Sequence, residues 1–94
     1  MPGLIQKVLR FPLEWKGLQE IEMPKDGKIL TINNQMSISA LWVLCDPEQP
    51  NEKRKFELYA TGDPIQPEKG FTRHYVGSYT DHRSTIVQHL FERI

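Results

Sequence analysis

The chain has 94 residues, and its 12 Lys plus Arg are balanced by 12 Asp plus Glu, so the formal net charge is zero. A chain of this length predicts one domain, residues 1–94. The balanced charge creates no global field for nucleic acid or for an anionic membrane, and we expect no general nucleic-acid binding. One cysteine excludes an internal disulfide, and no apolar run approaches the ~20 residues of a membrane span. These features predict a soluble, cytoplasmic protein.

The N-terminal segments alternate apolar and polar residues, which is typical of β-strands. The first predicted strand covers residues 5–15, and Pro12 places it at a sheet edge because proline cannot donate a ladder hydrogen bond. Its apolar face consists of Ile5, Leu9, Phe11, Leu13 and Trp15. A second edge strand is predicted at Gln19–Met23, with Glu20 and Glu22 turned to solvent.

Residues 28–47 predict the central hairpin of the fold, entered through an Asp26-Gly27 turn. A polar turn at Asn33–Gln35 separates its two strands, because Asn tolerates left-handed backbone. The second strand is apolar on both faces: Ile38, Ala40, Trp42 and Leu44 alternate with Leu41, Val43 and Cys45. A strand of this kind must be covered on both faces, which predicts that Trp42 is buried.

The C-terminal half contains three further predicted strands. After a surface loop at residues 46–52, residues 53–60 predict a half-buried strand with Lys53, Lys55, Glu57 and Tyr59 outward. A turn at Gly62 leads to residues 71–79, whose alternation puts Phe71, Arg73, Tyr75 and Gly77 on one side. Residues 84–94 fit either a helix capped by Ser84 or a strand, and the β-branched residues at 85–87 favour the strand.

The pattern as a whole predicts an all-β fold. We expect a small single-domain antiparallel sandwich, or a partly open barrel, of about six to seven short strands with a strand at the C-terminus. A C-terminal helix is the alternative.

The sequence contains no spacing typical of an active site. Cys45 lies in the most apolar segment, which favours simple packing over nucleophilic catalysis. His74, His82 and His89 lack the spacing of a metal site. We therefore expect a protein that is not an enzyme and that uses no cofactor or metal.

A local basic cluster supplies the candidate ligand- or partner-binding residues. These are Lys53, Arg54, Tyr59, Arg73 and His74. Arginine forks beside aromatic rings hold phosphate-bearing ligands or single strands, and Arg83 and Tyr75 would join such a site if the segments pair. The alternative is a solvated face whose charges protect a sheet edge from aggregation.

Several short motifs are spread along the chain. They are F-P-L at 11–13, Q-E-I-E-M-P at 19–24, K-I-L at 28–30, L-W-V-L-C-D-P at 41–47, E-K-R at 52–54, G-D-P-I at 62–65, Y-V-G at 75–77 and H-L-F-E at 89–92. In this order they resemble a family of short phage and prophage proteins known only as a domain of unknown function. The resemblance is most specific in the Trp-to-Pro stretch and departs at Asp63, where the family has His, and in the turn at 81–84. It implies a phage or mobile-element origin and an all-β fold ending in a strand. It implies no catalytic residues.

That origin suggests a non-enzymatic phage-derived binding protein. Its partner would be a host protein, with an anti-defence or replication-blocking role, or a small nucleotide signal that it sequesters. A β-domain needs only a surface of suitable shape with a few aromatic and Arg anchors for such a function. The alternative is a structural or assembly protein of a phage complex, in which strand edges pair with copies of the same chain as a homo-oligomer.

Overall fold

The computed structural model describes residues 5–14, 17–35, 38–80 and 85–94, and these contain strands and no helix. The strands are β1 (Lys7–Pro12), β2 (Leu18–Pro24), β3 (Lys28–Gln35), β4 (Ile38–Cys45), β5 (Asn51–Ala60), β6 (Arg73–Thr80) and β7 (Val87–Arg93). The predictions of an all-β fold and of a C-terminal strand are confirmed, and the alternative of a C-terminal helix is wrong. Trp15, Ser84 and Arg83 lie outside the described residues.

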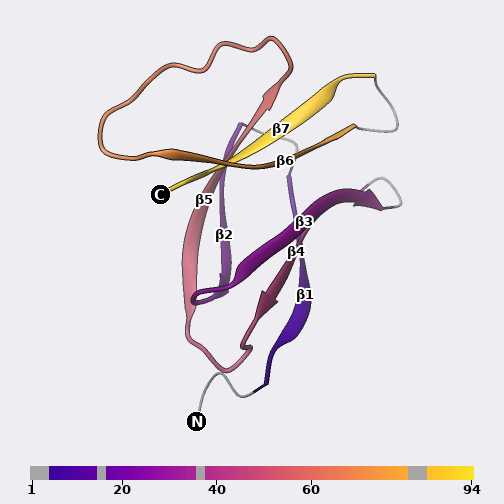
Figure 1. The fold of residues 1–94 in the computed structure, drawn as a ribbon, viewed down its shortest axis with the longest axis vertical. Coiled ribbons are helices and arrows are strands. Elements are labelled where there is room, and N and C mark those ends of the chain that lie inside the picture. Colours follow the sequence, from indigo (N-terminus) through magenta and orange to yellow (C-terminus); the bar gives the residue numbers. More distant parts are fainter. Residues whose placement is uncertain (1–4, 15–16, 36–37, 81–84) are drawn as a thin grey trace.

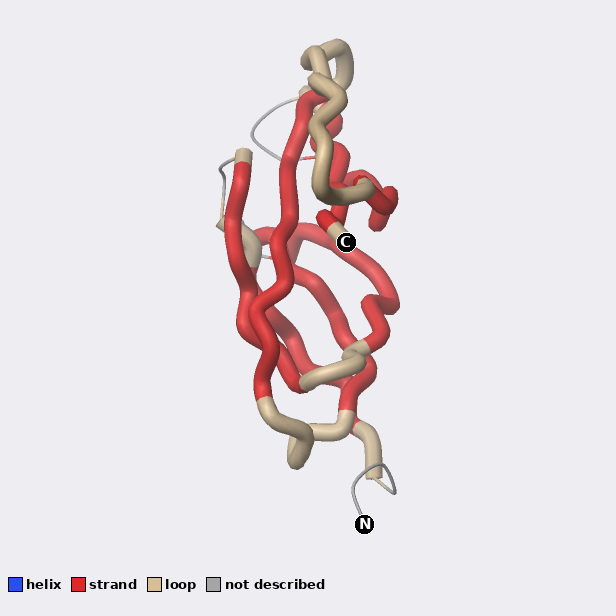
Figure 2. The backbone as a smooth tube through the Cα atoms, turned by 90° about the vertical axis from the view of Figure 1, so that its left-hand side faces the viewer, coloured by secondary structure: helices blue, strands red, loops and turns tan. Residues whose placement is uncertain are grey.

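The strands form two antiparallel sheets that pack face to face (Figure 1). One sheet has three strands in the order β1-β4-β3, and the other has four in the order β2-β5-β7-β6. The Cα atoms extend over 46 × 37 × 15 Å, so the molecule is thin along one axis. Figure 2 shows the backbone turned by 90° about the vertical axis, with the strands in red. The arrangement is a sandwich that does not close into a barrel. As predicted, β1 and β2 are edge strands.

The core lies between the two sheets and takes one face of β4. Its largest fully buried side chains are Phe56, Met23, Leu41, Leu90, Val43 and Cys45. The other face of β4 is only half covered, so the prediction that Trp42 is buried is wrong. Trp42 instead donates its indole N–H to Asn33 Oδ1 at 2.9 Å, and the Arg10 guanidinium lies 6.0 Å from its ring centre.

The polar segments between strands are shorter than the sequence suggests. Asn33 pairs with Ala40 in the β3–β4 ladder, so the residues predicted as a turn at Asn33–Gln35 extend the strand instead. The loop predicted at 46–52 ends earlier, because β5 begins at Asn51. Asp46 is buried, and its carboxylate accepts a hydrogen bond from the backbone N–H of Glu48.

The Asp26-Gly27 turn is confirmed, and its two residues have different roles. Asp26 takes the left-handed conformation at φ 64°, and the Gly27 N–H donates to Pro24 O at 3.2 Å. Gly27 is required for a different reason. A Cβ at this position would lie 2.8 Å from Val43 Cγ1, so only glycine lets the turn rest against β4.

A β-bulge in β6 changes which side chains share a face. The register shifts between Tyr75 and Gly77, so Gly77 lies opposite the buried Leu90 while Tyr75 stays opposite Phe91. The prediction that Tyr75 and Gly77 share a side is therefore wrong, because alternation is broken by the extra residue. A Cβ at Gly77 would lie 2.9 Å from Ile32 Cγ2, which brings β6 close to β3.

Candidate functional site

The face of the four-stranded sheet that points away from the three-stranded sheet, here called its outer face, carries most of the chemistry. Phe56 and Leu58 of β5 enter the core, so alternation puts Glu57 and Tyr59 on the outer face. The β5–β7 register sets Glu57 opposite Phe91. Arginines from β6 and β7 reach the same carboxylate. We call Glu57, Tyr59, Arg73 and Arg93 the Glu57 cluster.

Glu57 is at the centre of this cluster and is only 3% exposed. Its Oε2 accepts from Arg73 Nε at 2.7 Å. Its Oε1 accepts from Arg93 Nη2 at 2.8 Å and from the Tyr59 hydroxyl at 3.1 Å. A buried carboxylate is stable only with partners of this kind, and two guanidinium groups more than neutralise it.

The partners determine the protonation states in the cluster. Burial alone would raise the pKa of Glu57, but the hydrogen bonds from Arg73, Arg93 and Tyr59 outweigh it and lower that pKa to about 2. Burial, and then the hydrogen bond to the Glu57 carboxylate, raise the pKa of Tyr59. At neutral pH the cluster therefore contains an ionised Glu57 and a protonated phenol.

The two arginines also attach the long loop between β5 and β6, which forms a wide arc beside these strands in Figure 1. Arg73 Nη1 donates to the backbone oxygen of Gln66 at 2.9 Å. The Arg73 and Arg93 guanidiniums lie 5.0 and 4.1 Å from the ring centre of Phe71, at the end of this loop. Both arginines thus make hydrogen bonds and cation–π contacts with partners in the same chain.

A row of aromatic side chains continues the outer face beyond the Glu57 cluster. Tyr75 is 57% exposed, yet its ring makes a T-shaped contact with Phe91 at 5.2 Å and its hydroxyl bonds His89 Nδ1 at 2.9 Å. His89 Nε2 in turn lies 2.8 Å from Thr61 Oγ1. Tyr59 packs against the other side of the row, 6.0 Å from Phe91. Tyr75 is therefore an exposed ring held in one position.

Of the five residues predicted as a site, Tyr59 and Arg73 come together at Glu57. Arg54 lies on the inner face of β5, where Nε and Nη2 donate to Glu92 at 2.6 and 2.7 Å and Nη1 donates to Gly27 O at 2.6 Å. The hydrogen bond to Glu92 raises the pKa of Arg54 further. Arg54 thus joins parts of the fold.

The remaining two predicted residues lie elsewhere. Lys53 is exposed near the start of β5, in register with Glu22 of β2. His74 is exposed, and adjacent positions of a strand point to opposite faces, so it lies on the other side of β6 from Arg73. The five residues do not converge on one point.

Sequence reasoning missed Glu57, Arg93 and His89 as members of the site. Glu57 was predicted to face outward, where a carboxylate is usually solvated. The alternation of the strand does not indicate that the arginines of β6 and β7 bury this carboxylate. Arg93 lies in the segment whose helical and β patterns were nearly balanced. Its contact with Glu57 depends on the β5–β7 pairing.

Other kinds of site find no support in the residues that the structure describes. Residues 5–14, 17–35, 38–80 and 85–94 include no group of three or more His, Cys, Asp or Glu placed to hold a metal ion. Cys45 is buried, and burial together with the neighbouring Asp46 carboxylate raises the pKa of its thiol. In the same part of the chain, no helix has the length and apolar character needed to cross a bilayer.

Comparison with known proteins identifies a family without an assigned activity. Searches of curated proteins and of solved structures returned no match. A family model described as "Domain of unknown function (DUF7352)" matches residues 5–94. Because this model covers nearly the whole chain, the protein belongs to the DUF7352 family.

Proposed function

We propose that this protein is a non-enzymatic binding protein whose partner is another protein. It would bind through the Tyr75 face, defined as Tyr75, Phe91, His89 and Tyr59 on the outer face of β5, β7 and β6. The observation that carries the proposal is the Tyr75 ring, which is exposed and yet fixed by Phe91 and His89. Protein interfaces concentrate their binding energy in such aromatic anchors, and a ring already fixed loses little freedom on binding.

The Glu57 cluster favours a protein partner over a small nucleotide. Arg73 and Arg93 lie on the same face as the aromatic row, and Glu57 already holds both. A phosphate group would have to compete with a buried carboxylate for them. A protein surface can contact Tyr75 without breaking these ion pairs, so the cluster acts as a rigid support for the face.

The resemblance to short phage and prophage proteins supports a more specific version of this proposal. A phage protein working in the host cytoplasm would meet host defence or replication proteins, and inhibition requires only that it cover part of a host protein.

The alternative is a structural or assembly role, which would use strand edges such as β1 and β2 to pair with copies of the chain.

The test combines capture from a host lysate with native mass spectrometry. The immobilised protein should retain one host protein in a stable ratio, and Tyr75→Ala should weaken retention by at least about tenfold, as expected for an interface anchor. Ile5→Ala is the matched control, because Ile5 is a 70% exposed apolar residue away from the Tyr75 face. That variant should retain the host protein normally.

Three results would overturn this proposal. A bound mass of a few hundred daltons that disappears in Arg73→Ala would identify a nucleotide-sequestering protein. Large species whose size grows with protein concentration would identify an assembly protein. Equal retention of the host protein by the wild type and by Tyr75→Ala would place the interface elsewhere.

A further inference from the structure

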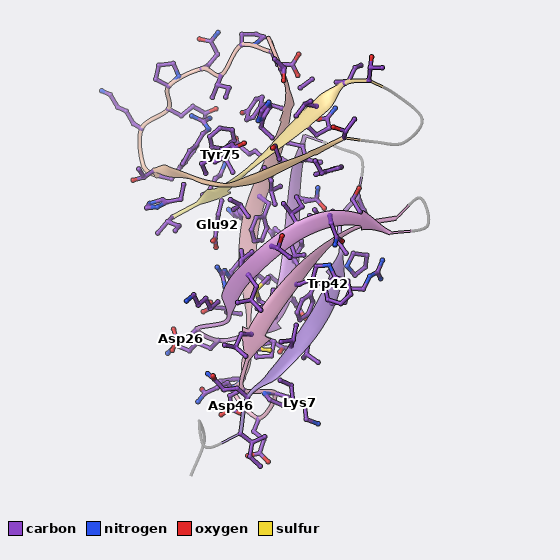
Figure 3. The ribbon with its side chains drawn as sticks, turned by 45° about the vertical axis from the view of Figure 1, so that its right-hand side comes forward. Lys7, Asp26, Trp42, Asp46, Tyr75 and Glu92 are labelled. Atoms are coloured by element: carbon purple, nitrogen blue, oxygen red, sulfur yellow. The ribbon has the colours of Figure 1, made fainter. Side chains whose placement is uncertain are left out.

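We infer a second interaction surface on the other side of the molecule, suited to an amphipathic helix with acidic flanks on a partner protein. The surface is the outer face of the three-stranded sheet, on the side away from the core. Leu41, Val43 and Cys45 are in the core, so alternation turns Trp42 and Leu44 outward. Figure 3 shows that Trp42 and Tyr75 belong to different sheets, so this surface is distinct from the Tyr75 face.

The strand register arranges this surface in rows across the sheet. One row is Val8, Leu44 and Lys28, and the next is Arg10, Trp42 and Thr31. Val8 is 52% exposed, and Trp42 and Leu44 are half-buried. The middle of the face is therefore an apolar stripe along β4, open to contact.

The charges around this stripe have one sign. Strands β1, β3 and β4 contain no Asp or Glu, and their register puts Arg10 and Lys28 on this face. Lys7 lies opposite the core residue Cys45 and so belongs to the other face. The four-stranded sheet is different, because Glu20 and Glu22 lie in register with Lys55 and Lys53 there. The charged residues that these three strands place on the face are therefore all positive, which is complementary to an acidic partner. It also disfavours a second copy of this chain, because two such faces would bring like charges together.

The dimensions and chemistry fit a helix. Arg10 on β1 and Lys28 on β3 lie on the two sides of the β4 stripe, and three strands span roughly 10 Å, close to the diameter of a helix. Sheet faces are commonly covered by a helix that places its apolar stripe on them. Val8 and Leu44 are aliphatic, and Trp42 is the single aromatic ring in the two rows that the register defines on this face. This composition suits a protein better than a single-stranded nucleic acid that stacks successive bases.

The test uses a peptide of known chemistry as the probe. The first peptide is an amphipathic helix of about 15 residues with a leucine stripe and Glu on both flanks, and the reference peptide has Lys at each Glu position. Trp15→Phe leaves Trp42 as the sole tryptophan, so its fluorescence reports binding. The Glu peptide should bind at least about tenfold more tightly than the Lys peptide.

Charge-reversal variants locate the binding site. Arg10→Glu should weaken binding of the Glu peptide by at least about tenfold. Lys69→Glu also replaces a positive charge by a negative one, but on the exposed loop between β5 and β6, and it should leave binding unchanged. Tyr75→Ala should also bind the Glu peptide normally, so a failure of the function proposed for the Tyr75 face would not affect this result.

Other outcomes would overturn the inference. Equal binding of the Glu peptide and the Lys peptide would show that the surface binds the leucine stripe without recognising the charges beside it. Tighter binding of an oligothymidylate of about 15 nucleotides would identify a nucleic-acid surface. A concentration-dependent dimer abolished by Val8→Ser would show that a second copy covers the face. Loss of peptide binding in Tyr75→Ala but not in Arg10→Glu would place the peptide on the four-stranded sheet instead of the three-stranded sheet.

Discussion

At the residue scale, Glu57 is the group whose ionisation affects the most neighbours. Arg73 and Arg93 both donate to it, and the side chains of these arginines are only 14% and 20% exposed. Removing one partner of a buried ion pair is costly, because the remaining charges are left without compensation. A neutral side chain of the same shape at position 57 therefore isolates the contribution of the charge.

We predict that Glu57→Gln lowers the free energy of unfolding by about 2 kcal/mol at pH 7, less than the full pKa difference implies because the arginines are partly hydrated. The pKa of Glu57 is lowered from 4.5 to about 2 in the fold, so its contribution is complete above pH ~4.5 and is lost as the pH falls through ~2. Urea unfolding of both proteins between pH 7 and pH 2 should show the difference vanish. Glu20→Gln, at an exposed position of β2, should change stability by less than ~0.5 kcal/mol. A constant difference at all pH values would contradict this assignment.

At the residue scale, two of the five candidate residues lie together and the others do not. Tyr59 and Arg73 were chosen as an aromatic and an arginine that could converge if their segments pair, and both donate to Glu57. Arg54 was chosen for the same reason but points to the other face of β5. One position along a strand decides this difference, and a list of basic residues ignores it.

At the element scale, the β6 bulge places a glycine where β6 approaches β3. A Cβ at Gly77 would lie 2.9 Å from a branched methyl group of Ile32, which has little freedom to move. We predict that Gly77→Ala lowers the free energy of unfolding by about 1–2 kcal/mol through overpacking. Urea unfolding measures this loss.

Gly17→Ala is the control for this prediction, because a Cβ there would meet no atom within 4 Å. Its stability should stay within ~0.5 kcal/mol of the wild type. If the two alanine variants are equally stable, then β6 and β3 are not in close contact at Gly77.

Alternation identified the strands reliably, because one face of each is apolar. The edge positions of β1 and β2 also followed from the sequence, through Pro12 and the outward Glu20 and Glu22. The two β-bulges could not be predicted from the sequence. The extra residues in β3 and β6 are visible only in the register with β4 and β7, and each one reverses the face of the residues that follow it.

At the scale of the whole molecule, Arg54 connects the two sheets. It starts from β5 and binds Glu92 on β7 through two nitrogens, which closes an ion pair within the four-stranded sheet. Its third nitrogen reaches the backbone oxygen of Gly27, in the turn where the chain crosses to β3. The planar guanidinium makes all three contacts at once, which an ammonium group on a flexible stem cannot do.

We predict that Arg54→Lys lowers the free energy of unfolding by about 2 kcal/mol although it keeps the charge, because Glu92 is buried and one of its oxygens loses its partner. The neighbouring Lys53→Ala, on the exposed face of the same strand, should cost less than ~0.5 kcal/mol. Urea unfolding gives both values, and hydrogen exchange at Gly27 and Lys28 should accelerate only in Arg54→Lys. Unchanged exchange there would mean that the turn is held by its own backbone hydrogen bond and its packing on Val43, and that Arg54 stabilises one sheet without joining the two.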